Sequence, residues 1–172
     1  MPDLTQLPRQ GADVPGDHRD AQGPAPKLDY DPKTGLFKIK TMLPDGMSFP
    51  LDFGFIPSTR CDDGDPMDIM VLIDEPCAIG TLLDVRLIGV IEASEVEDGR
   101  TERNDRILGV ATVSHLYARV RKVDDLEPTF VDNLNQFWVQ KDSLEGKRFT
   151  VIGVRDPQQA VKLIRKAAKA AK

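Results

Sequence analysis

Four short segments rich in valine and isoleucine set the main limit on how this chain can fold. They are separated by polar stretches, and they read IMVLI at 69–73, LLDVRLIGVIEA at 82–93, ILGVATV at 107–113 and FTVIGV at 149–154. Short apolar runs of β-branched side chains favour buried strands. The sequence therefore predicts a sheet or a small barrel at the centre of the fold.

Helical spacing is confined to the C-terminal third. Asp124 or Asp125 is expected to cap one helix, whose apolar residues recur at three- and four-residue intervals, at Leu126, Phe130, Leu134 and Phe137. A second helix is expected to begin with Asp156 as N-cap and Pro157 at the first position. Its apolar stripe would be Val161, Ile164, Ala168 and Ala171. Strands followed by two helices predict a mainly β (α+β) fold, a small β-barrel with C-terminal helices packed against it.

A hairpin is predicted near the start of the chain. KLDYDPKTGLFKIKTML, residues 27–43, has two strand-like runs joined by a turn at 31–35. Side chains alternate along a strand, so Thr41 is expected on one face and Lys38 and Lys40 on the other.

The composition suits one domain, since 172 residues with 40% hydrophobic residues can bury a sizeable core. Residues 1–26 hold five prolines, three glycines and few large apolar residues. We expect 1–26 to be a flexible arm or an extension that wraps the surface, and 27–172 to be a single domain.

Charge and residue counts exclude several functional classes. A formal net charge of −5 argues against a nucleic-acid partner, and no apolar run approaches the roughly 20 residues of a membrane span. The two cysteines, Cys61 and Cys77, are too few for a disulfide framework or a zinc site. These features predict a reduced, cytoplasmic protein with no nucleic-acid or membrane partner.

The segment RCDDGDPMDIMVL at 60–72 gathers acidic residues around Gly64 and Pro66. A solvated turn is one interpretation. The other is a site where Asp63, Asp65 and Asp68 converge from a rigid loop, which would suit Mg²⁺ or Mn²⁺ because both prefer carboxylate oxygens. An EF-hand is excluded, since Asp68 stands where that loop needs glycine and Asp74 where it needs glutamate.

This segment resembles the D-G-D-P-x-D signature of the first family of soluble inorganic pyrophosphatases. Other blocks resemble the same family in the same order, among them KLDYDPKTG, LPDGMSFPLDFGFIPSTR, VRLIGVIEA, NDRILGVA and NQFWVQKDSLEGK. The resemblance covers roughly residues 27–154. It implies a small OB-like barrel with C-terminal helices, a homo-oligomer that is usually a hexamer in bacteria, and Mg²⁺-dependent hydrolysis of pyrophosphate to two phosphates by a metal-activated water, with Mn²⁺ as an alternative metal.

The resemblance also implies a role for each matching residue. Asp65 would be the catalytic base or water-orienting group, and phosphate contacts would come from Lys27, Arg106 and Lys141. The metal ligands would be Asp63, Asp65, Asp68, Glu95 and Asp105. Strict spacing from ILGV selects Asn104 in place of Asp105, but only Asp105 supplies a charge.

The chain departs from the family pattern at several polar positions. Thr41 stands at an arginine, Phe53 at a tyrosine, Gln140 at another tyrosine, and Asp29 at a glutamate. Lys40 could replace the arginine only if a bulge shifted the strand register, and Arg60 is a second possible substitute. These losses leave an alternative function open, a catalytically weakened metal/phosphate- or nucleotide-binding module of the same fold.

Overall fold

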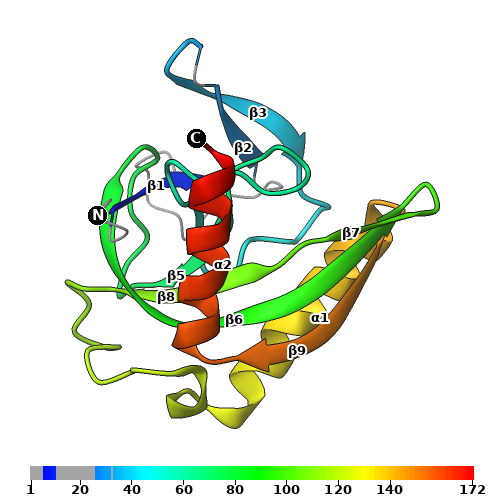
Figure 1. Cartoon of the computed structure of the whole chain (residues 1–172). Helices are drawn as coiled ribbons and strands as arrows, with labels where there is room; N and C mark the ends of the chain where they lie inside the picture. The colour runs from blue at the N-terminus through cyan, green and yellow to red at the C-terminus, as the bar shows by residue number, and fades with distance from the viewer. Residues whose placement is uncertain (1–5, 11–25, 32) are drawn as a thin grey trace.

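The computed structural model describes residues 6–10, 26–31 and 33–172, and it has a mainly β architecture with two long helices (Figure 1). The strands in this part of the chain are β1 (Gln6–Gln10), β2 (Pro26–Asp31), β3 (Leu36–Met42), β4 (Asp52–Phe55), β5 (Asp68–Leu72), β6 (Leu82–Glu97), β7 (Arg100–Arg103), β8 (Arg106–Ala111) and β9 (Arg148–Arg155). The helices are a short 3₁₀ turn η2 (Val123–Asp125), α1 (Pro128–Leu144) and α2 (Pro157–Ala170).

Most of the strands join one sheet. Within the described residues its order is β1-β4-β5-β8-β6-β7, and β1 also pairs with β6. β9 pairs with residues 90–96 of β6. The pairings β1-β4-β5-β8-β6-β1 therefore return to their start, as in a small barrel. The four valine- and isoleucine-rich segments are β5, β6, β8 and β9, which confirms those predictions.

The N-terminal segment contributes β1 to this sheet. Its backbone pairs with β4 at Arg9↔Gly54 and with β6 at Leu7↔Leu83. Residues 6–10 are thus paired with barrel strands on both sides. The rest of the segment lies outside the described residues, and the division of the chain at residue 26 stays a prediction.

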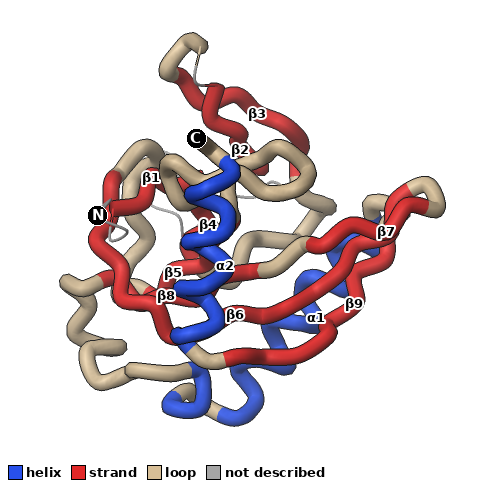
Figure 2. Tube along the Cα trace, viewed as in Figure 1, coloured by secondary structure: helices blue, strands red, loops and turns tan. Residues whose placement is uncertain are grey.

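The predicted hairpin is present as a separate two-stranded sheet, β2 with β3 (Figure 2). Its turn uses Gly35 at φ +70°, a left-handed conformation that favours glycine, and the Gly35 amide donates to the Asp31 carbonyl at 2.9 Å.

Apolar residues on the two faces of the sheet form two cores. On β5, Ile69 and Val71 pack in the cluster that contains α2, whereas Met70 and Leu72 pack in the cluster that contains α1. Because β5 is covered on both faces, its sequence is a continuous apolar run.

The helices agree with the sequence in position but differ in detail. Asp156 caps α2 as predicted, and its Oδ1 accepts from the Gln159 amide at 2.8 Å. The predicted cap of α1 was wrong: Asp124 and Asp125 lie in η2, and the residue before the helix is Glu127. The predicted stripe of α2 was also shifted, since its buried residues are Ala160, Ile164 and Ala167. No helix in the described ranges is long and apolar enough to span a membrane.

Ile164 offers a test of the contact between α2 and the sheet. Ile164→Ala removes a fully buried side chain and should lower the free energy of unfolding by about 2–4 kcal/mol. Ile39→Ala is the matched control, because Ile39 is 65% exposed on β3 and its loss should change stability by less than about 0.5 kcal/mol. Urea unfolding of both variants measures this, and equal effects would contradict the packing described here.

Candidate active site

The acidic loop between β4 and β5 is held by hydrogen bonds from its backbone amides to other groups of the same loop. Gly64 has φ +92°, the Asp65 amide donates to Asp63 Oδ1 at 2.9 Å, and the Cys61 amide donates to the Asp65 carbonyl at 2.8 Å. The Met67 amide donates to Thr59 Oγ1 at 2.9 Å, which ties the end of the loop to its start. The loop is therefore an ordered turn that leads directly into Asp68, the first residue of β5.

All the residues that the sequence assigned to the site border one cavity of about 1640 Å³. They are Lys27, Asp63, Asp65, Asp68, Glu95, Asp105, Arg106 and Lys141. These residues come from β2, the acidic loop, β5, β6, β8 and α1, so the fold brings together groups that are far apart in the chain.

The structure places the acidic groups around this cavity without bringing them into direct coordination geometry. Asp63 and Asp65 are exposed, and Asp68 is partly buried. Among the described residues, no three Asp, Glu, His or Cys side chains lie close enough to hold a metal ion. The expectation that the three loop carboxylates already share a cation position is thus not met in this structure.

Asp68 is instead paired with Arg106. Asp68 Oδ2 lies 2.6 Å from Arg106 Nη1, and the same nitrogen donates to the Asn104 side-chain oxygen. The guanidinium is 4.5 Å from the centre of the Trp138 ring, a cation–π contact that holds it in place. Burial raises the pKa of Asp68, and the positive charges of Arg106 and Lys27 lower it. The negative charges of Asp63 and Asp65 raise that pKa further.

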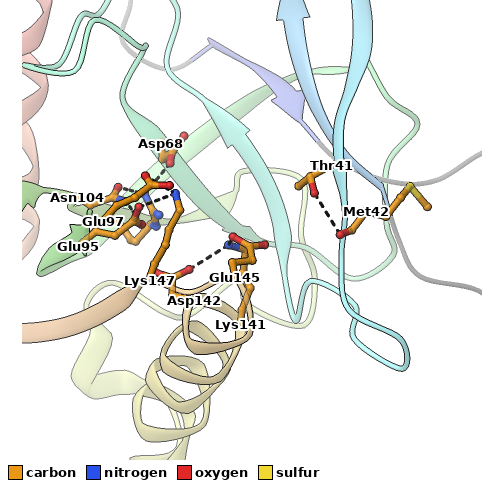
Figure 3. A network of polar contacts seen from close by, with 11 residues as sticks. Thr41, Met42, Asp68, Glu95, Glu97, Asn104, Lys141, Asp142, Glu145 and Lys147 are labelled. Carbon is orange, nitrogen blue, oxygen red and sulfur yellow. Dashed lines mark hydrogen bonds and ion pairs between the residues drawn. The ribbon is translucent and has the colours of Figure 1, made fainter. Parts of the chain in front are cut away.

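Asn104 continues the network to Glu95 (Figure 3). Its Nδ2 donates to Glu95 Oε2 at 2.9 Å, and Glu95 Oε1 lies 2.9 Å from Lys147 Nζ. Lys147 also pairs with Glu97 at 3.0 Å. Burial favours a raised pKa for Glu95, but the hydrogen bond and charge of Lys147 outweigh it and lower that pKa. Lys147 lies within the NQFWVQKDSLEGK block, yet the sequence did not single it out.

Asp105 points to a different group of contacts. Its Oδ1 accepts from Arg103 Nε at 2.6 Å and from the Ala93 amide at 3.1 Å. Both Asn104 and Asp105 border the cavity, and Asn104 is the one that donates to the Glu95 carboxylate and accepts from Arg106. Asn104 is thus a direct neighbour of Glu95, and the choice between Asn104 and Asp105 as the second-site residue stays a prediction.

The cations gather on the wall formed by β2, β8 and α1. Lys141 is buried and pairs with Asp142 at 3.0 Å and with Glu145 at 2.7 Å. Burial lowers the pKa of Lys27, and the charges of Arg106, Lys40 and Lys141 lower it further while Asp68 opposes them. Lys27, Arg106 and Lys141 therefore lie close enough for their charges to interact, and their role as phosphate-binding groups stays a prediction.

The positions that depart from the family pattern have separate environments. Phe53 is buried and stacks on Phe49, whereas Thr41 and Arg60 border the cavity. Gln140 is exposed and borders a hollow on α1 outside the candidate site.

Trp138, which the sequence did not mark as functional, borders the cavity beneath Arg106 and lies three residues before Lys141.

Comparison with known proteins agrees with this geometry. Residues 21–172 match the family model described as inorganic pyrophosphatase. The chain is 34% identical over 152 residues to an inorganic pyrophosphatase of Nostoc sp., an alignment that spans 88% of each protein. The crystal structure of the inorganic pyrophosphatase from Thermus thermophilus superposes with a TM-score of 0.83 at 25% identity, covering 99% of this chain and 92% of that one. A second structure, from Anaplasma phagocytophilum, has a TM-score of 0.82 at 28% identity and covers 99% and 94% of the two chains. The chain therefore belongs to the inorganic pyrophosphatase family.

Proposed function

We propose that this protein hydrolyses inorganic pyrophosphate to two phosphates with the help of a divalent cation, Mg²⁺ or alternatively Mn²⁺. The observation that carries the proposal is that all the sequence-assigned residues, carboxylates and cations alike, border one cavity. A dianionic or more highly charged phosphate compound needs both kinds of group, since cations bind its oxygens and carboxylates hold a metal or accept a proton.

The donor set fits a hard divalent cation. Asp63, Asp65, Asp68 and Glu95 offer carboxylate oxygens around one cavity, and these are the ligands that Mg²⁺ and Mn²⁺ prefer. The raised pKa of Asp68 reflects burial beside other carboxylates, an arrangement that a cation would relieve. When bound, the cation would reduce the charge of the phosphates and lower the pKa of a neighbouring water.

Asp65 is the group best placed to accept a proton from the attacking water. Asp63 is bonded within the loop and Asp68 is paired with Arg106, whereas no described residue donates a hydrogen bond to the Asp65 side chain. An exposed carboxylate on an ordered loop can act as a general base or orient a water molecule. Lys27, Arg106 and Lys141 would bind phosphate oxygens and stabilise the charge of the transferred group.

Assembly and location follow from the resemblance and the composition alone. We expect a homo-oligomer, a hexamer, that resides in the cytoplasm. Sedimentation at working concentration would measure the assembly directly.

Asp65→Asn tests the catalytic assignment. The substitution is nearly isosteric and removes the proton acceptor, so phosphate release under saturating Mg²⁺ should fall by about a hundredfold or more with little change in unfolding. Asp62→Asn is the matched control, because the Asp62 side chain is 88% exposed and lies 3.9 Å from Lys166. Wild-type turnover in Asp65→Asn would refute the assignment. Pyrophosphate binding without phosphate release by the wild type, in Mg²⁺ or Mn²⁺, would support the weakened binding module instead.

Asn104 and Asp105 can be separated by their effect on metal dependence. Asn104→Ala should raise the Mg²⁺ concentration needed for half-maximal phosphate release by about tenfold, because it removes a group that holds Glu95. Asp105→Ala should leave that concentration within about twofold, since its carboxylate contacts Arg103 and the Ala93 amide. The reverse pattern would restore Asp105 as the ligand.

A further inference from the structure

The β2–β3 hairpin contains a bulge at Lys40. Lys27 pairs with Thr41 and Leu28 pairs with Ile39, so Lys40 is left between two successive pairs. In a regular strand Lys40 would point away from the face that Thr41 occupies. A bulge places two residues of one strand opposite one residue of the other and can turn a side chain to a new direction.

The result is that Lys40 and Thr41 both border the cavity. Lys40 Nζ lies 2.9 Å from Asp29 Oδ2, and the hydrogen bond that Lys40 donates to Asp29, together with the charges of Asp29, Asp65 and Asp68, raises the pKa of Lys40. Lys38, two residues earlier, does not border the cavity and pairs with Asp31 at 2.6 Å. The two lysines of one strand thus have different surroundings.

Lys40 differs from the other cations in how easily it can change partner. Arg106 and Lys141 are almost fully buried, and their departure would leave carboxylates without a counter-charge. The Lys40 side chain is 48% exposed and that of Asp29 is 37% exposed. An exposed ion pair contributes only about 0–1 kcal/mol, so an entering anion can compete for Lys40 at small cost.

We propose that Lys40 binds a phosphate group of pyrophosphate at the rim of the cavity, and that the bulge in β3 is what directs it there. The identity of the anion rests on the proposed function, whereas the direction of Lys40 rests on the strand register. A lysine ammonium binds phosphate as a compact charge and needs no fixed plane, which suits a half-exposed position.

Lys40→Met and Lys38→Met form a matched pair that tests the proposal. Both remove one lysine charge from β3 and one exposed ion pair to an aspartate of the same hairpin. Lys40→Met should raise the KM for pyrophosphate by about tenfold to a hundredfold, the loss expected for one hydrogen bond to a charged group. Lys38→Met should leave it within about twofold.

A binding measurement separates this inference from the proposed activity. Calorimetric titration with pyrophosphate in EDTA reports anion binding without metal-dependent turnover, and Lys40→Met should weaken that binding by about tenfold or more. The double variant Lys40→Met/Thr41→Lys should recover part of the lost affinity, because Thr41 borders the same cavity.

The outcomes divide clearly. If Lys40→Met and Lys38→Met behave alike, in both KM and calorimetry, Lys40 is not a substrate contact and the inference is overturned. If the wild type releases no phosphate but Lys40→Met still weakens pyrophosphate binding, the proposed hydrolysis fails and the role of Lys40 stands. If the wild type neither binds nor hydrolyses pyrophosphate, both proposals fall.

Discussion

The ion pair between Asp68 and Arg106 connects the parts of the molecule that form the cavity. β5 and β8 are parallel and pair at Ile69↔Ile107, so the residues just before these, Asp68 and Arg106, become neighbours through the register alone. α1 supplies Trp138 beneath the guanidinium, and Asn104 accepts a further hydrogen bond. Arg106 is almost fully buried, so removing Asp68 would leave its charge away from water without a counter-charge, which is strongly destabilising. The sheet register, the position of α1 and the charge of the cavity therefore depend on one another.

The same coupling explains how a cavity can hold so many charges. Arg106 is balanced by Asp68, Lys141 by Asp142 and Glu145, and Lys147 by Glu95 and Glu97. Burying a charged side chain removes it from water and costs free energy. The ion pair with a neighbour of opposite charge offsets that cost. The arrangement keeps cations and carboxylates in place before any ligand enters, so little reorganisation is needed when a phosphate compound binds.

Local patterns in the sequence predicted much of this molecule. The β-branched runs marked β5, β6, β8 and β9, Asp156 marked the start of α2, and the acidic signature with its flanking blocks identified residues that border one cavity. The details that local patterns left open depend on partners distant in the chain. β1 has few large apolar residues and is held by backbone pairing with β4 and β6, and the choice between Asn104 and Asp105 depends on where Glu95 and Arg103 lie.

Lys40 shows the same limit at a single position. Alternation along β3 assigns it to the face opposite Thr41, and only the pairing with β2 reveals the bulge at which both residues border the cavity. The position of Lys40 affects the charge that the cavity offers to an anion. The chain carries a formal charge of −5, so its overall field does not attract a phosphate compound, and most cavity cations are already balanced by carboxylates. Lys27, whose pKa burial lowers, forms no ion pair with a described residue, and an entering anion would favour its charged form. Lys27 and the exposed Lys40 are thus two cations whose charge an anion can still use, and both lie at the bulge between β2 and β3.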